Sequence, residues 1–392
     1  MPNLPEALPV PDQPLPAAPA YGQSTLSEIL PSAASALGVP GYANPLGLAS
    51  TRRVVLVMID GLGWNQLKKH LAHAPFLRSL FDRAQKLGTG FPSTTATSLT
   101  SVATGVAPGV HGMLGYDVVD PARRRVVNQL GGWPKDLDPE AWQQQPTVFE
   151  QAAAHGLHVE TVSIAQFASS ALTRAALRGP KFTAAGQVAA RARATHEVFK
   201  THRSALVYSY FNELDKAGHK YGVDSEAWRG TLEELDHAVK AIASRVPEET
   251  TVLVTGDHGM IDVPAAWRID YSKQPELIES VELTSGEPRG VQLSFAAGTS
   301  TEVRQRVKAA WQRAYGSKAW VLERDEAIAA GYFGDISEQH AARLGDLMIL
   351  AAEEVAFYDG RRVAPYAFAM VGQHGSLTAA ERFVPLLVHR TS

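Results

Sequence analysis

The stretch "RVVLVMID" at residues 53–60 holds six consecutive apolar residues, three of them valine, and then ends in an aspartate. Such a run is typical of a strand that is buried on both faces of a parallel sheet. Similar runs follow at residues 157–164, 204–211, 250–257 and 344–352. Stretches with helical periodicity lie between them, at residues 65–84, 148–156 and 228–246. The alternation predicts an α/β fold with a mostly parallel central sheet sandwiched by helices.

Residues 262–340 do not show this alternation of strands and helices. The segment "SGEPRG" (285–290) predicts a hairpin turn, residues 300–316 predict a helix, and residues 318–326 predict a strand. We therefore expect a small α+β insertion at 262–340 within a single domain of residues 25–392. The pattern of the main sheet resumes at residue 344.

The N-terminal segment holds seven prolines in its first twenty residues, with neither a basic region nor an apolar core of the kind found in signal peptides. It predicts an extended, disordered leader over residues 1–24. No apolar run elsewhere approaches the roughly 20 residues that span a bilayer. We expect a cytoplasmic protein that does not bind membranes.

The composition limits which partners, metal ligands and nucleophiles the protein can use. The 392 residues carry a formal charge of only -3 and no long basic run, so we do not expect a nucleic-acid polymer as partner. There is no cysteine, which excludes disulfides, thiolate metal sites and a cysteine nucleophile. Any metal ion must therefore bind to histidines and carboxylates. The oligomeric state is left open.

Acidic and imidazole side chains follow the ends of the predicted strands. In open α/β sheets, ligands bind beyond the carboxyl ends of the strands, where the loops converge on one crevice. Single aspartates after a strand are commonly turn or cap residues, but here several strands deliver such groups together. A Gly-flanked histidine in "VGQHGSL" adds to them. The candidate residues are Asp60, Asp215, His219, Asp257, His258 and His374.

These six side chains suit divalent metal ions. Catalytic zinc commonly takes three protein ligands and keeps one position open, so six ligands fit two ions. Two Zn²⁺ ions bring a charge of about +4 against about -3 from the carboxylates, and the resulting net charge of about +1 attracts an anion.

The segment "GFPSTTATSLTSVATG" at residues 90–105 contains eight serines and threonines and no charge. One or two hydroxyl residues cap a helix start, but eight exceed that need. The hydroxyls of Thr97, Thr100, Ser101 and Thr104 are expected to cap the helix, pack or bond its backbone.

Five segments in this order, "MIDGLG", "GFPSTTATSLTSVATG", "ELDKAGHKYG", "TGDHGM" and "GQHG", resemble the alkaline phosphatase superfamily. The likeness is greatest to its type I phosphodiesterase/nucleotide pyrophosphatase family, and it covers residues 53–262 and 344–389. The resemblance implies an alkaline phosphatase-like catalytic domain with two metal ions, Zn²⁺ by family likeness.

The resemblance also implies residue roles. Thr95 is the nucleophile at the start of a helix and forms a covalent phospho-threonine. One metal ion is held by Thr95, Asp60, Asp257 and His258, and the other by Asp215, His219 and His374. The family has an asparagine three residues after the nucleophile, where this chain has Ser98. Ser98 and Thr94 are therefore the substrate-binding candidates.

The resemblance implies a two-metal phosphodiesterase or nucleotide pyrophosphatase with a small phosphodiester or nucleotide substrate. Many monoesterases place a guanidinium beside the nucleophile. Residues 88–119 contain no Lys or Arg, which favours a diester, although Arg123, Arg124 and Arg125 follow. In the loop at 111–146, Tyr116 and Trp133 are candidates for stacking on a leaving group.

Alternatives remain. They are a phosphomonoesterase or another phosphoryl-transfer enzyme on the same scaffold, and a metal-binding relative without turnover. A sulfatase is disfavoured because its formylglycine precursor needs a cysteine or a suitable serine motif, and a mutase because its nucleophile is usually serine.

Overall fold

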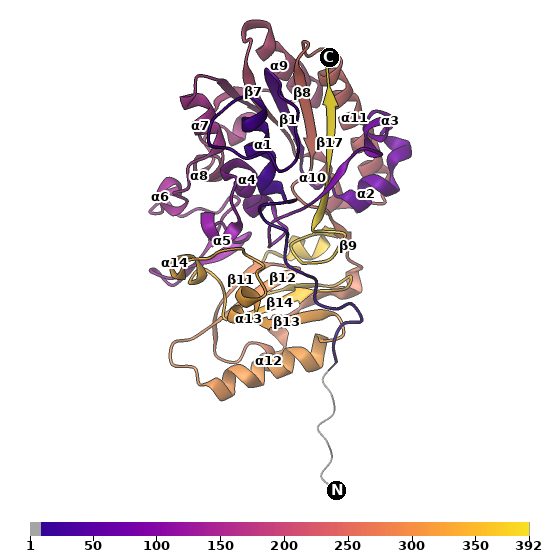
Figure 1. Ribbon diagram of the computed structural model, residues 1–392. Coiled ribbons are helices and arrows are strands. Elements are labelled where there is room, and N and C mark those ends of the chain that lie inside the picture. Colours follow the sequence, from indigo (N-terminus) through magenta and orange to yellow (C-terminus); the bar gives the residue numbers. More distant parts are fainter. Residues whose placement is uncertain (1–8, 392) are drawn as a thin grey trace.

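The larger sheet has seven strands in the order β2-β17-β8-β1-β7-β5-β6 in the computed structural model, which describes residues 9–391 (Figure 1). Strands β8, β1, β7, β5 and β6 run parallel, and β17 is antiparallel to β8 and β2. This arrangement confirms the predicted mostly parallel sheet. The strands are β1 (Arg53–Ile59), β2 (Gln85–Gly88), β5 (His158–Ser163), β6 (Lys181–Ala184), β7 (Ala205–Phe211), β8 (Thr250–Thr255) and β17 (Phe383–Arg390).

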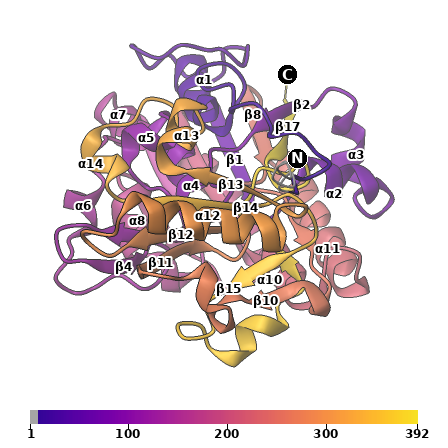
Figure 2. The same cartoon turned by 90° about the horizontal axis from the view of Figure 1, so that it is seen from below.

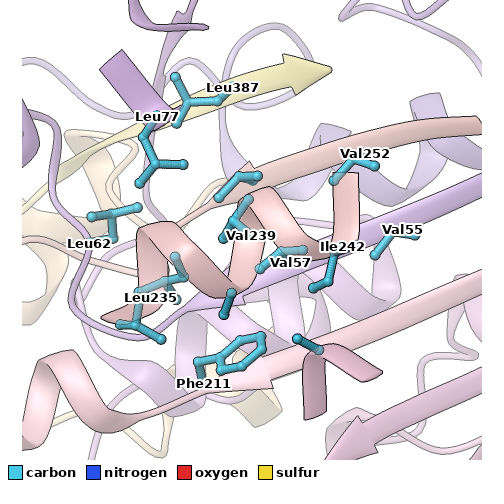
Figure 3. Packing of buried hydrophobic residues seen from close by; sticks show 14 of the residues in the cluster. Val55, Val57, Leu62, Leu77, Phe211, Leu235, Val239, Ile242, Val252 and Leu387 are labelled. Carbon is cyan, nitrogen blue, oxygen red and sulfur yellow. The ribbon is translucent and has the colours of Figure 1, made fainter. Parts of the chain in front are cut away.

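After Arg53, strand β1 is apolar at every position because its side chains divide between two hydrophobic layers. Val55, Val57 and Ile59 face one layer. Val54, Leu56 and Met58 face the other. Figure 3 shows Val55 and Val57 of the first layer beside Val239 and Ile242 of helix α11. Burial on both faces therefore replaces the alternation of apolar and polar residues that a half-exposed strand would show.

Helices cover both faces of this sheet. The first layer is closed by α2 (Trp64–Lys69), α3 (Pro75–Phe81), α9 (Val188–Thr201), α10 (Glu213–Tyr221) and α11 (Glu226–Ala243). The second layer is closed by α1 (Ile29–Ala36), α4 (Thr95–Thr104) and α7 (Val148–Ala154). Each predicted helical stretch thus contains helix, but residues 65–84 form two helices with a short 3-10 turn between them. Pro75 begins α3, and proline both lacks a backbone N–H and disfavours helix in the residue before it.

A smaller antiparallel sheet lies below the larger one in Figure 1, in the order β11-β12-β14-β13. Its strands are β11 (Val281–Glu287), β12 (Gly290–Phe295), β13 (Ala319–Glu323) and β14 (Leu347–Ala351). Helix α12 (Thr301–Tyr315) packs on its outer face, as the view from below shows (Figure 2). The predicted hairpin, helix and strand of the insertion are all present.

The strand predicted at residues 344–352 does not belong to the larger sheet. It forms β14, which pairs with β12 and β13 at the centre of the smaller sheet. All five residues of β14 are buried, so its apolar run resembles that of a main-sheet strand although its partners differ. The α+β unit therefore continues past residue 340, the boundary that the sequence suggested.

Short elements connect the two sheets. Three two-stranded pairs are β3 (Asp117–Asp120) with β4 (Arg125–Asn128), β9 (Ile261–Asp262) with β16 (Gly372–Gln373), and β10 (Arg268–Asp270) with β15 (Ala356–Tyr358). The remaining α-helices are α5 (Pro108–His111), α6 (Pro139–Trp142), α8 (Ala171–Ala176), α13 (Arg324–Ala329) and α14 (Glu338–Ala341). Among the described residues, no helix has the length and apolar character needed to cross a membrane.

Part of the proline-rich N-terminal segment is packed against the body of the protein. The Tyr21 hydroxyl donates to the backbone carbonyl of Tyr332 (2.7 Å) and accepts from the backbone N–H of Phe91 (3.2 Å). The side chains of Trp320 and Tyr332 also donate to the backbone carbonyls of Gln13 (3.1 Å) and Pro16 (2.6 Å). The packing of this part therefore differs from the disorder predicted over residues 1–24. Residues 1–8 lie outside the described part of the chain.

A fully buried ion pair joins the smaller sheet to the larger one. Arg289, in the β11–β12 turn, donates from Nε and Nη2 to the two carboxylate oxygens of Glu381 at 2.7 and 2.8 Å. Glu381 lies just before β17, and its carboxylate also accepts from the backbone N–H of Ser376 (3.1 Å). Breaking one partner of such a pair leaves a buried charge without compensation.

We therefore expect Arg289→Met to lower the free energy of unfolding by about 3–5 kcal/mol. Chemical denaturation followed by circular dichroism measures this change. The control is Arg306→Met, which removes an exposed pair with Glu279 and should cost less than about 1 kcal/mol. Equal losses in the two variants would contradict the structural role of the buried pair.

Candidate active site

Three aspartates lie at the carboxyl ends of neighbouring parallel strands. Asp60 directly follows β1, Asp257 lies two residues after β8, and Asp215 lies in the first turn of α10, after β7. Strand β1 pairs with both β7 and β8, so the three strands end at one edge of the sheet. The predicted convergence of these carboxylates follows from this strand order.

The first group of side chains surrounds His258. Its Nε2 atom lies 3.3 Å from Asp60 Oδ1 and 3.5 Å from Asp257 Oδ2. The Thr95 hydroxyl lies 3.2 Å from the same nitrogen. Asp257 and His258 are fully buried, and Asp60 and Thr95 are nearly so. The four residues that the sequence assigned to one metal ion therefore meet at one point.

The second group lies beside the first. Asp215 and His219 are four residues apart on α10, so they share a helix face, and Asp215 Oδ1 lies 3.3 Å from His219 Nε2. The Nε2 atom of His374 lies 4.0 Å from the same oxygen. The His374 ring stacks on His258, with ring centroids 3.5 Å apart. All six candidate ligands are thus brought together.

The three histidines present the same ring nitrogen to the site. Each Nδ1 lies within hydrogen-bond distance of a backbone carbonyl: His258 bonds Gly259 (2.9 Å), His219 bonds Gly372 (2.8 Å), and His374 bonds Ser93 (2.9 Å). A hydrogen atom on Nδ1 leaves Nε2 with a free lone pair that faces the carboxylates. Metal-binding histidines are oriented in this way by carbonyl or carboxylate partners.

The carboxylates present oxygens that lack partners. Asp60 Oδ1, Asp215 Oδ1 and Asp257 Oδ2 are buried and accept no hydrogen bond from the described residues. Their other contacts orient them, since Tyr210 donates its hydroxyl to Asp60 Oδ2 and the backbone N–H of Gly61 donates to Asp257 Oδ1 (3.0 Å). Buried like charges need a compensating cation. This set of carboxylates and imidazoles fits divalent metal ions such as zinc.

The charges of the site also shift its acid–base equilibria. Burial and the neighbouring charge of Asp60 raise the pKa of Asp257 above its usual range. Burial opposes the charged form of His258, but attraction to Asp257 and Asp60 raises its pKa overall. Burial, followed by repulsion from His258 and His219, lowers the pKa of His374. Protons therefore compete with cations for these ligands.

Thr95 is the first residue of α4, after the extended N-cap residue Thr94. Both threonines line the cavity that contains the site. The first backbone N–H groups of a helix have no partners within it, and such a helix end favours anions. Ser98 is fully buried and does not line this cavity, and its hydroxyl has no partner among the described residues. Thr94 is therefore better placed than Ser98 to contact substrate.

Most other hydroxyls of the helix bond its own backbone, as expected. Thr100 donates to Ala96 O (2.6 Å), Ser101 to Thr97 O (2.9 Å) and Thr104 to Thr100 O (2.7 Å).

The cavity has a volume of about 750 Å³ and lies between the two sheets. Tyr116 lines it, whereas Trp133 packs edge-on against Trp142 and donates to Gln129 O (2.9 Å). Stacking on a ligand thus remains a prediction for Tyr116 alone. The three arginines that the sequence offered as cations near the substrate do not line the cavity. They pair with surface carboxylates instead: Arg123 and Arg125 with Asp136, and Arg124 with Glu282.

Sequence reasoning missed three further groups at this cavity. Tyr210 bonds Asp60, Lys216 lines the wall beside Asp215, and Glu287 reaches the wall from the hairpin of the smaller sheet. Lys216 is part of the "DKAGH" segment, and Tyr210 is the penultimate residue of strand β7. The position of Glu287 depends on contacts between distant segments, and no local pattern indicates it.

Solved structures share this fold. Murine ectonucleotide pyrophosphatase/phosphodiesterase 5 superposes with a TM-score of 0.68 at 17% identity, covering 87% of this chain and 88% of that chain. An inactive threonine-to-alanine variant of the same murine protein, in complex with AMP, gives a TM-score of 0.66 at 17% identity over 86% and 88%. Phosphonoacetate hydrolase from Sinorhizobium meliloti 1021, in complex with phosphonoformate, gives 0.64 at 18% identity over 87% and 90%.

The sequence itself matches one family model over most of its length. The model describes type I phosphodiesterase / nucleotide pyrophosphatase and matches residues 54–377. This range includes every candidate ligand and the helix that begins at Thr95. The chain therefore belongs to the type I phosphodiesterase / nucleotide pyrophosphatase family.

Proposed function

We propose that this protein is a two-metal phosphodiesterase or nucleotide pyrophosphatase that uses Thr95 as its nucleophile. The observation that carries the proposal is the position of the Thr95 hydroxyl. It lies at a helix N-terminus, 3.2 Å from His258 Nε2, and lines a cavity with Asp60, Asp215 and His374. The murine neighbour that a threonine-to-alanine change makes inactive supports this choice.

Two sets of ligands would hold the ions. Asp60, Asp257, His258 and the Thr95 oxygen form one set. Asp215, His219 and His374 form the other. Bound divalent ions would lower the pKa of the threonine hydroxyl and offset the negative charge that develops on the phosphoryl oxygens. Zinc is proposed because imidazole and carboxylate ligands suit it.

The chain's own groups then perform two displacements. The Thr95 hydroxyl gives its proton to solvent and its oxygen attacks phosphorus, the bond from phosphorus to the leaving oxygen breaks, and that oxygen takes a proton from solvent. A water molecule next attacks the phosphorus of the phospho-threonine and gives a proton to solvent, the bond from phosphorus to Thr95 breaks, and the Thr95 oxygen takes a proton from solvent. The Thr94 hydroxyl and the N–H groups at the start of α4 bind the phosphoryl oxygens.

A diester or pyrophosphate substrate suits the charge of the cavity. Arg362 and Lys216 are cations on its wall, but Arg362 is paired with Asp117 at 3.0 Å. A monoester dianion needs more positive charge than a diester monoanion. AMP and phosphonoformate in the two neighbours are small ligands, which supports a small substrate rather than a polymer.

We expect Thr95→Ala to lower turnover of bis(p-nitrophenyl) phosphate by at least about 1000-fold, because no other hydroxyl replaces the attacking atom. Metal content, measured by elemental analysis, should stay largely unchanged. The matched control is Thr104→Ala in the same helix, which should keep near-normal turnover. A Thr95→Ala protein that retains a tenth of the activity would refute the nucleophile.

A chelator should abolish turnover, and added Zn²⁺ should restore it, since the buried carboxylates need a divalent cation. Asp215→Asn together with His219→Ala should reduce the bound metal from two ions to one per chain. Elemental analysis and activity assays measure both effects. Activity that survives the chelator would exclude the metal mechanism.

The proposed substrate class predicts faster hydrolysis of bis(p-nitrophenyl) phosphate and of a nucleotide aryl ester than of p-nitrophenyl phosphate. The comparison uses kcat/KM at saturating metal. Faster hydrolysis of the monoester would favour a phosphomonoesterase on the same scaffold.

A further inference from the structure

The described N-terminal segment, residues 9–24, contacts both sheets, and we call it the strap (Figure 1). On the side of the smaller sheet, Trp320 of β13 and Tyr332 donate to its backbone carbonyls. On the side of the larger sheet, Arg382, directly before β17, donates to the carbonyl of Ala17 (2.6 Å). None of the strap residues lines the cavity. The strap therefore joins the two sheets from outside the active site.

Tyr21 is the strap residue that reaches the loop before the nucleophile. Its hydroxyl accepts from the backbone N–H of Phe91 (3.2 Å) and donates to the backbone carbonyl of Tyr332 (2.7 Å). Burial raises the pKa of this hydroxyl, so it stays protonated and makes both bonds at once. Without the Tyr21 oxygen, the Phe91 N–H would lose its acceptor, and an unpaired buried donor is costly.

The loop that begins at Phe91 carries two groups of the site. It ends at Thr95, the first residue of α4. Between them, the carbonyl oxygen of Ser93 lies 2.9 Å from Nδ1 of His374, and the hydroxyl of Ser93 donates to Ser376 O (2.7 Å). A displacement of the backbone at Phe91 would therefore move the nucleophile and the carbonyl that orients a metal ligand.

Small displacements of such groups matter for the reaction. A misplacement of about 1 Å at reacting atoms costs about 100-fold in rate, because the attacking atom must be close to its target and aligned with it. The partners that orient metal-binding histidines likewise affect metal affinity by about 10-fold to 100-fold. Both quantities depend here on the backbone of residues 91–95.

We propose that Tyr21 is a positioning residue for the reaction: its hydroxyl fixes the backbone of residues 91–95, which sets the position of the Thr95 hydroxyl and the orientation of His374. The N-terminal strap then contributes to activity although it does not touch the substrate. This inference rests on the proposed function, since it assumes that Thr95 attacks phosphorus and that His374 binds a metal ion.

The test uses Tyr21→Phe, which removes the hydroxyl and keeps the ring. We expect kcat for bis(p-nitrophenyl) phosphate at saturating Zn²⁺ to fall at least about ten-fold, with KM within about three-fold. We also expect one of the two Zn²⁺ ions to bind at least about three-fold more weakly, because Ser93 no longer holds His374 in place. Competition with a coloured chelator measures this affinity without turnover.

The matched control is Tyr332→Phe, which removes a different hydrogen bond of the same strap, the one to the carbonyl of Pro16 (2.6 Å). It keeps the backbone carbonyl to which Tyr21 donates, and it does not alter the acceptor of the Phe91 N–H. Thermal unfolding should show similar losses of stability in the two variants. We expect Tyr332→Phe to keep kcat and both Zn²⁺ affinities within about two-fold.

Normal kcat in Tyr21→Phe would overturn the inference. Equal losses of kcat in the two variants would also overturn it, because the strap would then act only through stability. A loss of kcat with unchanged Zn²⁺ affinity would overturn the link to His374. If Tyr21→Phe does not fold, as judged by circular dichroism, 4-aminophenylalanine at position 21 decides by the same criteria, since its amine donates to Tyr332 O but is a poor acceptor for the Phe91 N–H.

The result is separable from the proposed function. Thr95→Ala tests that function without altering the strap. An inactive Thr95→Ala protein together with a fully active Tyr21→Phe protein would refute the role of Tyr21 alone. A Thr95→Ala protein that keeps its activity would refute the function, and the Zn²⁺ titration would still decide whether Tyr21 acts on His374.

Discussion

The site is governed by repulsion between three carboxylates at close range, of which Asp60 and Asp257 are buried and Asp215 is 15% exposed. Asp60, Asp215 and Asp257 are held at one sheet edge by the order of β8, β1 and β7, and each keeps an oxygen without a hydrogen-bond partner among the described residues. Such an arrangement costs stability in the absence of cations. The carbonyl bonds at Nδ1 orient the three histidine rings so that each presents its Nε2 atom to these carboxylates.

Local patterns predicted the parts of the site that lie on strand ends and on one helix. Asp60 and Asp257 follow continuous apolar strands, and Asp215 with His219 has the spacing of one helix face. Their convergence was expected at the carboxyl edge of a parallel sheet, and the resemblance to the family implied how the ligands divide between two ions. Ser98 illustrates the limit of such transfer: it matches the family position in sequence, yet it is buried away from the cavity.

The errors in the sequence interpretation have physical causes. A buried strand has the same composition in either sheet, so residues 344–352 did not reveal that they form the centre of the smaller one. The helical spacing of apolar residues continues through Pro75, although the helix itself cannot, because proline has no backbone N–H to donate. Glu287 was missed because its environment is made by Tyr116 and Gly375, which are distant from it in the chain.

Strand β17 has a consequence for the way the protein is made. It lies between β2 and β8, although it is synthesised after every other strand of the larger sheet. The hydrogen bond from the Tyr21 hydroxyl to the Tyr332 carbonyl likewise cannot form until Tyr332 has been synthesised, some three hundred residues later. Long-range pairing of this kind delays folding. The larger sheet therefore closes only after translation has passed residue 390, and until then β2 and β8 each lack the strand that pairs with one of their edges, the kind of open edge that favours aggregation.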